Sequence, residues 1–428
     1  MMQLLVTPCV VDSNRRFVTT GRCAALRPLL ALVLFAAVLA LPALRAEQIP
    51  EIESNLTDQS SRFKVGTLAV FVYGSAGLGF DDNVFLAPTS RQAALFAFLV
   101  PGIRAKRPED NHGVTLQFDY QGRARRYAGE GNVAHASYME HQFAIQAVWK
   151  ISARQTWNFS ENAAYLVDPI SASIPRTERF ENGLNLGTVY TGRTTDIDFS
   201  SAFSLMRFSR AAFRDLDFDN LNLDLKATYH DLGPKAHIVG EYGFNYYNLR
   251  DHQRSDFTVH SLLAGIATPV GENKGWVYEL RVGAALAQVV ANRAANRGDD
   301  QLTTFAVTAS ATWSKSDPNT FMKFSVRNSL EPSNNIGATF ANTYTVDARG
   351  QIAFNRFLRA GGGASMQWVE DIGTSRDVAR LNLSGSLSYH VTETFFYFGR
   401  IEYRQRFAHF RRDRYDDFRL LGGATYVF

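Results

Sequence analysis

The sequence predicts an all-β protein, a transmembrane up-and-down antiparallel β-barrel of about 18 strands behind a cleaved N-terminal signal peptide. Three observations support this prediction. Hydrophobicity alternates with a period of two residues through most of the chain, as in strands with one apolar face. No stretch after residue 46 is a long uninterrupted apolar run, which excludes transmembrane helices. The links between these segments alternate between short and long, as in an up-and-down barrel.

The first 46 residues have the three parts of a secretory signal peptide. Arginines precede an apolar run from Leu29 to Leu41, and small residues lead to Ala46, just before Glu47. The apolar run is about thirteen residues long, whereas a membrane-spanning helix needs ~20. We therefore expect export and cleavage after residue 46, and not a helical membrane anchor.

Composition excludes several classes of protein. Both cysteines, Cys9 and Cys23, precede the expected cleavage site, so the mature chain would have neither a disulfide nor a cysteine-ligated metal. The expected signal peptide also carries five Arg and one Asp, and its removal brings the formal net charge from +4 to 0. A neutral chain of mixed charges is unlike a nucleic-acid-binding protein. We therefore expect no nucleic-acid partner.

A polar periplasmic leader, residues 47–62, precedes the expected barrel, residues 63–428. We expect a first strand from Phe63 to Phe80, followed by a loop at Asp81–Asn83. In a later strand Val114, Leu116, Phe118 and Tyr120 share one face, and polar residues alternate with them. The same alternation recurs in segments that begin near Phe143, Leu221, Ile238, Trp276, Phe305, Leu381 and Phe395.

The lengths of the links predict how the barrel is oriented in the membrane. Short links occur at 152–154, 192–193, 271–275, 317–319, 355–356 and 391–392, and longer, charged links at 128–134, 168–177, 209–217, 291–299, 332–336 and 409–414. Short turns are expected in the periplasm and long loops outside the cell. Trp149, Trp157, Trp276 and Trp313 lie near the short links, as in an aromatic girdle. A soluble β-solenoid or sandwich also alternates, but the polar face here is too rich in Arg, Glu, Ser and Thr for a packed core.

The last strand predicts which residues face lipid. Counting back from Phe428, every second residue belongs to a set that includes Tyr426, Leu420 and Phe418, while the other set includes Arg419 and Asp417. Gly423, Tyr426 and Phe428 resemble the C-terminal insertion signal of bacterial outer-membrane barrels. This resemblance implies the cell outer membrane of a Gram-negative bacterium, outer-membrane lipid as the neighbour, and the barrel-assembly machinery as a partner.

A second resemblance lies in the segment GLGFDDNVFL, Gly77 to Leu86, and in the later Pro101–Gly102. These residues resemble the β-barrel porin 2 family, whose motif this chain carries at Gly77, Asp81, Asp82, Asn83, Phe85, Pro101 and Gly102. Members of that family often resemble barrels encoded with exopolysaccharide export systems. The resemblance implies a polysaccharide as cargo and a periplasmic polysaccharide-export protein as a partner.

Extending the parity of the last strand predicts an arginine-rich pore lining. The inward residues of the last five strands include Arg349, Arg359, Arg380, Arg400, Glu402, Arg404, Arg406, Asp417 and Arg419, and Arg123 and Arg125 lie across the closing seam. Guanidinium groups pair with carboxylates and phosphates, so this wall would contact an anionic solute. The other interpretation is that arginine–carboxylate pairs stiffen the wall without contacting a solute.

The sequence predicts no enzyme, metal or cofactor. No histidine falls in an H-E-x-x-H motif, and no G-x-S-x-G elbow occurs. Ser388 and His390 share a strand face without a third group to orient them. Asp81, Asp82 and Asn83 are better explained as a turn at a strand end than as a cation site.

The leading hypothesis is therefore an outer-membrane channel for the export of a hydrophilic polymer of the exopolysaccharide type. One alternative is a general diffusion porin for small hydrophilic solutes. Another is a structural or adhesion barrel whose outer loops bind partners. No link is much longer than about twelve residues, so the sequence predicts no long inward loop of the kind that constricts porins.

Overall fold

The computed structural model describes residues 63–87, 89–107, 113–129, 131–167, 177–230, 236–250, 255–268, 275–291, 301–314, 320–333, 340–372, 377–408 and 414–428. All the described residues belong to one unit of the chain, Pro42–Phe428. The expected signal peptide and leader lie outside them. None of the helices that the structure describes is long and apolar enough to cross a membrane.

Strands make up most of the described chain. They are β1 (Phe63–Val65), β2 (Leu68–Asp81), β3 (Ala94–Arg107), β4 (Val114–Tyr127), β5 (Tyr138–Ser152), β6 (Gln155–Leu166), β7 (Arg179–Thr191), β8 (Thr195–Phe208), β9 (Phe218–Tyr229), β10 (His237–Leu249), β11 (Asp256–Ala267), β12 (Trp276–Ala291), β13 (Gln301–Ser314), β14 (Phe321–Pro332), β15 (Phe340–Ala353), β16 (Leu358–Asp371), β17 (Asp377–His390), β18 (Phe395–Ala408) and β19 (Tyr415–Val427). Two short 3₁₀ helices, η1 (Ala134–Ala136) and η2 (Ala211–Leu216), lie in the longer links.

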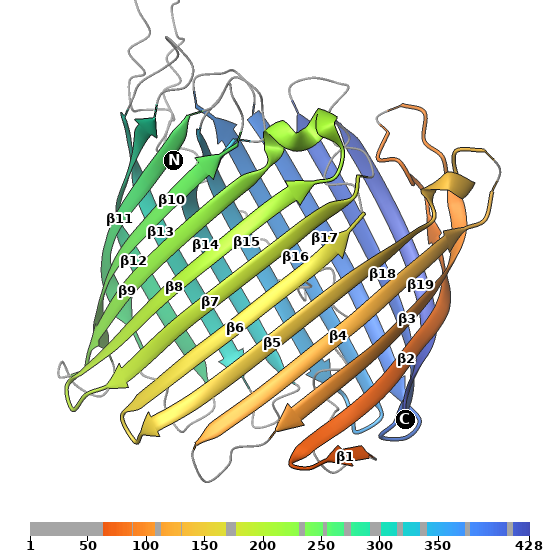
Figure 1. Cartoon of the computed structure of the whole chain (residues 1–428), viewed down its shortest axis with the longest axis horizontal. Helices are drawn as coiled ribbons and strands as arrows, with labels where there is room; N and C mark the ends of the chain where they lie inside the picture. Colours follow the sequence, from red (N-terminus) through yellow and green to blue (C-terminus); the bar gives the residue numbers. More distant parts are fainter. Residues whose placement is uncertain are drawn as a thin grey trace, which may run out of the picture. The chain divides into compact units, whose positions relative to one another are not determined.

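The strands β2 to β19 form a closed antiparallel ring of 18 strands, as predicted (Figure 1). Each strand pairs with its neighbours in sequence, and β19 pairs with β2 from Arg419↔Asp81 to Val427↔Tyr73. Closure is the physical requirement for a sheet in hydrocarbon, because lipid offers no partner to backbone groups at a free edge. The first strand of the chain, β1, is not part of this ring. It has three residues and pairs with β2.

The prediction of one continuous first strand from Phe63 to Phe80 is wrong in one detail. The chain turns back at Gly66, whose φ of 62° lies in the left-handed region, so that Phe63 pairs with Val70. Glycine adopts this conformation without the steric cost of a Cβ atom. The strand that enters the ring therefore begins at Leu68 and ends at Asp81.

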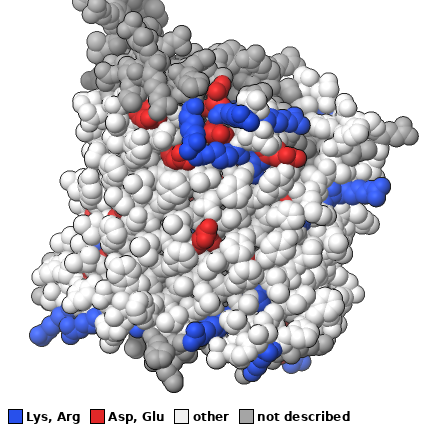
Figure 2. Space-filling model, viewed as in Figure 1, with Lys and Arg blue, Asp and Glu red and all other residues white. Residues whose placement is uncertain are grey.

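The outward face of the ring is an apolar belt. Its large apolar side chains are exposed, for example Leu78, Leu262 and Phe305 at 70%, 68% and 60%. Figure 2 shows this belt as a broad, mostly uncharged zone with Lys, Arg, Asp and Glu gathered toward its margins. Such an area of exposed apolar side chains is stable in hydrocarbon and not in water. The closed ring and its belt are typical of a transmembrane β-barrel.

The two ends of the ring differ. We call the end with the short turns and the C-terminus the turn end, and the opposite end the loop end. At the turn end tryptophans pair across neighbouring strands, Trp149 with Trp157 and Trp276 with Trp313, and the indole of Trp276 stacks on Tyr278. Aromatic rings at this level are typical of the membrane interface.

The largest apolar cluster lies inside the ring, near the loop end. Its members come from β10 to β15: Tyr247, Leu249, Phe257, Val259, Leu263, Ala285, Ala287, Ala306, Leu330 and Phe340. We call this set the inner apolar cluster. The rings of Phe257 on β11 and Phe340 on β15 are 5.1 Å apart between centroids, although β12, β13 and β14 separate the two strands in the ring. Part of the β14–β15 hairpin therefore leans into the barrel.

Candidate pore lining

All the residues predicted to line the pore belong to the inward-facing set. The register pairs Arg404 with Asp417 and Glu402 with Arg419, and it pairs Arg380 with Arg406. The alternating residues Phe418 and Leu420 are exposed on the outward face. Arg349, Arg359, Arg400, Arg123 and Arg125 have the same inward parity on their strands. Placement alone does not show contact with a solute, which stays a prediction.

An ion-pair network joins β19 to β2 where the ring closes. Arg419 Nε lies 3.0 Å from Asp81 Oδ2 and 3.2 Å from Asp417 Oδ2. Arg404 Nε donates to the same Asp417 oxygen at 2.9 Å. Asp81, Asp417 and Arg419 are almost completely buried. Burial weakens competition from water, so each charge here depends on its partners.

Two residues of β4 extend this network. The Tyr127 hydroxyl donates to Asp81 Oδ2 at 3.1 Å, and an Arg125 Nη1–H donates to the Tyr127 hydroxyl at 3.3 Å. The Arg125 guanidinium also lies over the Phe96 ring, 4.5 Å from its centroid. Arg125 is therefore held between a hydrogen bond and a cation–π contact. Arg125 thus links β4 to its neighbours in the wall at the loop end.

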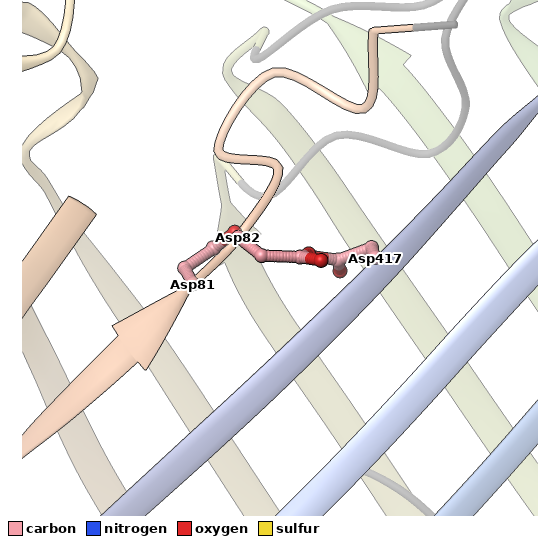
Figure 3. Close-up of side chains that lie close together, drawn as sticks. All are labelled: Asp81, Asp82 and Asp417. Carbon is pink, nitrogen blue, oxygen red and sulfur yellow. The ribbon is translucent and has the colours of Figure 1, made fainter. Parts of the chain in front are cut away.

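The carboxylates of Asp81, Asp82 and Asp417 come together where β2 ends beside β19 (Figure 3). Each offers one oxygen, and these oxygens lie within 4.8 Å of one another. Arg404 and Arg419 contact Asp417 and Asp81, and Arg91 Nη1 lies 4.0 Å from Asp82 Oδ2. A guanidinium group therefore lies beside each carboxylate of the cluster. The geometry is that of an ion-pair network.

The Asn83 side chain holds the chain in a turn after β2. The sequence predicts a turn at Asp81–Asn83. Its amide nitrogen donates to the carbonyl oxygens of Asp416 at 2.7 Å and Ala87 at 3.0 Å. Its amide oxygen accepts from the Ala87 N–H at 2.8 Å. Leu86, and not Asn83, has a left-handed backbone conformation in this loop, with a φ of 51°. Asn83 thus fastens the β2–β3 loop to the segment that begins β19.

The other motif residues, Pro101 and Gly102, are explained by packing. Proline has no N–H to donate, and the β3–β4 ladder skips Val100 and Pro101. A Cβ on Gly102 would lie 2.1 Å from the ring of Tyr73. Because Gly102 has none, Tyr73 crosses it and donates to Asp119 Oδ1 at 3.2 Å. Asp119 in turn accepts from Arg104 Nε at 2.7 Å, a pair that sequence reasoning missed.

Further arginines of the predicted lining are paired with carboxylates. Arg400 Nε lies 2.8 Å from Glu402 Oε1, and Arg123 Nη1 lies 3.6 Å from Glu140 Oε2. These contacts support the interpretation that much of the arginine wall is stiffened by ion pairs. The aromatic residue Phe396 is also buried, packed with Phe71 and Tyr73.

A second group of inward cations is not paired. Within the described residues, Lys323 and Arg327 on β14 and Arg349 on β15 contact no carboxylate. Lys323 lies directly opposite Arg349 in the register, and Arg327 is exposed inside the ring. Like charges at directly opposed positions repel one another. This cluster, Lys323, Arg327 and Arg349, is therefore the part of the wall where an anion would gain most.

An acidic wall lies on the other side of the ring, which sequence reasoning also missed. Asp196 and Asp198 on β8, Asp224 on β9 and Glu241 on β10 have inward parity. In the ring of 18 strands, β8 to β10 lie opposite β17 to β19. The alternation of Asp196 and Asp198 with Ile197 and Phe199 is the signal that predicts their orientation. Lys226 and Arg281 lie on the same side and pair with Glu279 and Glu241, so this wall carries mixed charges in which acids are the more numerous.

Ser388 and His390 are neighbours on the inward face of β17. The Ser388 hydroxyl lies 3.3 Å from His390 Nε2, and the His390 ring stacks on Phe396 with centroids 4.8 Å apart. Both side chains are buried. A nucleophile must reach its substrate, so the burial of this pair is consistent with a structural role.

The insertion-signal residues lie at the turn end of β19. The rings of Tyr426 and Phe428 meet edge to face with centroids 4.8 Å apart, and both residues belong to the outward-facing set. Gly423 pairs with Gly77 across the closing seam. Recognition by the assembly machinery stays a prediction.

No family model matches the chain, and no curated protein matches it. Three solved structures illustrate what it resembles. A BenF-like porin from Pseudomonas fluorescens Pf-5 has 12% identity and a TM-score of 0.45, covering 84% of this chain and 98% of the porin. Pseudomonas aeruginosa OccK2 (OpdF) has 11% identity and a TM-score of 0.44, with coverages of 84% and 98%. Acinetobacter baumannii OccAB3 has 9% identity and a TM-score of 0.43, with coverages of 84% and 99%.

Proposed function

We propose that the chain is an outer-membrane porin through which small hydrophilic solutes diffuse, with a preference for anions. The observation that carries this proposal is the unpaired cation cluster of Lys323, Arg327 and Arg349 on the inward face of β14 and β15. An 18-strand ring is wide enough for an aqueous channel. Cations that line such a channel attract anions and repel cations.

The size of the solute follows from the inner apolar cluster. Its side chains fill part of the lumen near the loop end, which leaves less room than an empty ring of this size. The exposed inward residues Asn162, Asn185 and Asp198 on β6 to β8 indicate that the other side of the lumen is open to water. A partly filled lumen favours small solutes over a folded or bulky polymer.

Export of a polysaccharide is the second candidate, and the observation that favours it is the sequence motif at Gly77–Phe85 and Pro101–Gly102. Within that proposal, a periplasmic polysaccharide-export protein would dock at the turn end. The inner apolar cluster counts against it unless the β14–β15 hairpin moves aside. Liposome swelling separates the two candidates. A porin admits mono- and disaccharides and excludes dextrans, whereas a polymer conduit admits both.

Planar bilayers test the proposed function directly. The purified chain should give steady single-channel conductance and, under a KCl gradient, a reversal potential on the chloride side. Arg327→Glu and Arg349→Glu should each move the reversal potential toward potassium, and Asp198→Asn should move it toward chloride. The matched control is Arg126→Glu, which reverses a charge on the outward parity of β4 and should leave ion preference unchanged.

Two results would contradict the proposal. Absence of any conductance from protein that shows the heat-modifiable gel shift of a folded barrel would leave a structural or adhesion role in first place. Conductance with an unchanged reversal potential in Arg327→Glu and Arg349→Glu would retain the channel but remove the cation cluster as its selectivity site.

A further inference from the structure

The wall of the ring is incomplete between β13 and β14. Their ladder runs from Ser314↔Phe321 to Thr308↔Arg327 and ends there. From there toward the loop end, Gln301–Ala306 of β13 pair with β12, and Asn328–Pro332 of β14 pair with β15. Neither segment has a partner in the other among the described residues. We call this break in the ladder, toward the loop end, the seam.

The β14–β15 hairpin leaves the wall at the seam and packs inside the ring. Leu330 on β14 and Phe340 on β15 have outward parity in an unbroken register. Yet both are buried in the inner apolar cluster, against inward-facing residues such as Phe257. An outward face can meet the inward face of β11 only if the hairpin lies inside the wall.

The same face of the hairpin carries two polar groups. Asn328 and Asn342 have the parity of Leu330 and Phe340, with Asn342 directly opposite Leu330. Both are more than nine-tenths buried, with 7% and 6% of their surface exposed. Their Oδ1 atoms accept no hydrogen bond within the part of the chain that the structure describes. Buried acceptors of this kind cost free energy until a donor reaches them.

The hydrocarbon lies directly outside the seam. Phe305 lies on the part of β13 that has no partner in β14, and it is among the most exposed apolar residues of the belt. The free N–H and C=O groups of this β13 edge cannot be satisfied by acyl chains. A molecule that fits the seam therefore combines a long apolar chain, which suits the inner apolar cluster, with a hydroxyl head, which donates to Asn328 and Asn342.

We propose that the seam is a lateral portal at which an amphiphile with a long acyl chain and a hydroxyl-bearing head enters the wall from the outer leaflet and binds against the β14–β15 hairpin. This binding site goes beyond the diffusion of hydrophilic solutes along the lumen, and it does not depend on that function. The chain would then exchange two kinds of solute by two routes.

A photoreactive monoacylglycerol with a diazirine in its acyl chain tests the portal. The full mature barrel is placed in phospholipid nanodiscs, irradiated with this probe, and mapped by mass spectrometry. We expect adducts on the inner apolar cluster, around Phe257, Leu330 and Phe340, in addition to the outward belt. The double variant Asn328→Leu/Asn342→Leu should reduce the inner adducts roughly three- to tenfold, as expected for the loss of one or two neutral hydrogen bonds.

A cysteine pair across the seam provides a reversible version of the test. If the β13–β14 ladder continued, Phe305 would lie opposite Leu330, so oxidised Phe305→Cys/Leu330→Cys would join the strands and close the seam. The expected mature chain has no other cysteine. The inner adducts should disappear on oxidation and return on reduction. The matched control is Ala309→Cys/Val326→Cys, an outward pair of the same strands within the existing ladder, whose oxidation should change nothing.

Adducts confined to the outward belt in the unmodified chain would overturn the portal. Inner adducts that persist unchanged in the oxidised Phe305→Cys/Leu330→Cys variant would also overturn it, because the probe would then arrive through the lumen. If this disulfide does not form, the asparagine variant decides, and unchanged inner adducts in Asn328→Leu/Asn342→Leu refute the site. Conductance in planar bilayers is measured on the same variants, so failure of the porin proposal is distinguished from failure of the portal.

Discussion

Arg419 Nε lies 3.0 Å from Asp81 Oδ2, and this ion pair joins the last strand of the ring to the first at the loop end. Asp81 is fully buried, and Arg419 exposes only 3% of its surface. The pair lies at the end of the β19–β2 ladder, where Arg419 and Asp81 are also register partners. Closure of the ring and pairing of its lining charges thus depend on the same two side chains.

The first prediction concerns this pair. Asp81→Ala should lower the free energy of unfolding by about 3–5 kcal/mol, because it leaves a buried guanidinium with less countercharge. Arg419→Met/Asp81→Leu should cost less than Asp81→Ala, since it removes both charges. The measurement is urea unfolding in liposomes, followed by tryptophan fluorescence. As a control, Asp416→Asn breaks an exposed pair with Arg91 and should cost no more than about 1 kcal/mol. Equal losses in Asp81→Ala and Asp416→Asn would show that the ion-pair network between β19 and β2 is not a stability element.

The second prediction concerns the close approach of β2 and β19. A Cβ on Gly77 would lie 2.1 Å from the carbonyl oxygen of Gly422, while a Cβ on Gly74 would have nothing within 4 Å. Gly77→Ala should therefore destabilise the barrel by about 1–3 kcal/mol or reduce its assembly, because the two strands must separate. Gly74→Ala, on the same strand, should change stability by less than about 0.5 kcal/mol. The temperature of the gel shift from folded to unfolded barrel measures both, and similar values for the two variants would contradict the close approach.

The third prediction concerns a charge on the lipid face. Glu161 has outward parity on β6, opposite Leu184 of β7, and Asn182 Nδ2 donates to its carboxylate at 3.0 Å. Carboxylates facing hydrocarbon are unfavourable, so Glu161→Leu/Asn182→Leu should stabilise the barrel by about 1–2 kcal/mol. The inward pair Asn162→Leu/Asn185→Leu on the same two strands faces water and should give no such gain. Loss of an oligomer instead of a gain in stability would show that Glu161 contacts a second copy of the chain.

The strand parity is the part of the lining that could be predicted from sequence. Lipid strongly favours apolar side chains, so Phe418, Leu420, Tyr426 and Phe428 identify the outward set, and the inward set follows residue by residue. This rule alone places Arg349 and Arg400 on the inward face. It equally predicts the inward orientation of Asp198 and Asp224 when the parity is extended beyond the last five strands.

Which of the inward charges are paired could not be predicted in the same way. Arg404 and Arg349 have the same parity, yet Arg404 is held by Asp417 while Arg349 contacts no carboxylate among the described residues. Which carboxylate reaches which guanidinium depends on the stagger between neighbouring strands and on the loops above them. Neither is encoded in a local pattern, because the partners are far apart in the chain.

The alternating pattern of the chain is sufficient to predict the closed ring, the approximate strand count and the two faces of each strand, because a sheet in hydrocarbon must alternate and must close. The departure of the upper part of β14 from β13, and its packing inside the barrel, follow only from the three-dimensional fold. Leu330 and Phe340 have the pattern of lipid-facing residues in the sequence, since an apolar side chain is equally stable against lipid or against the inner apolar cluster. The alternation that predicts a strand therefore cannot predict on which side of the wall the strand ends.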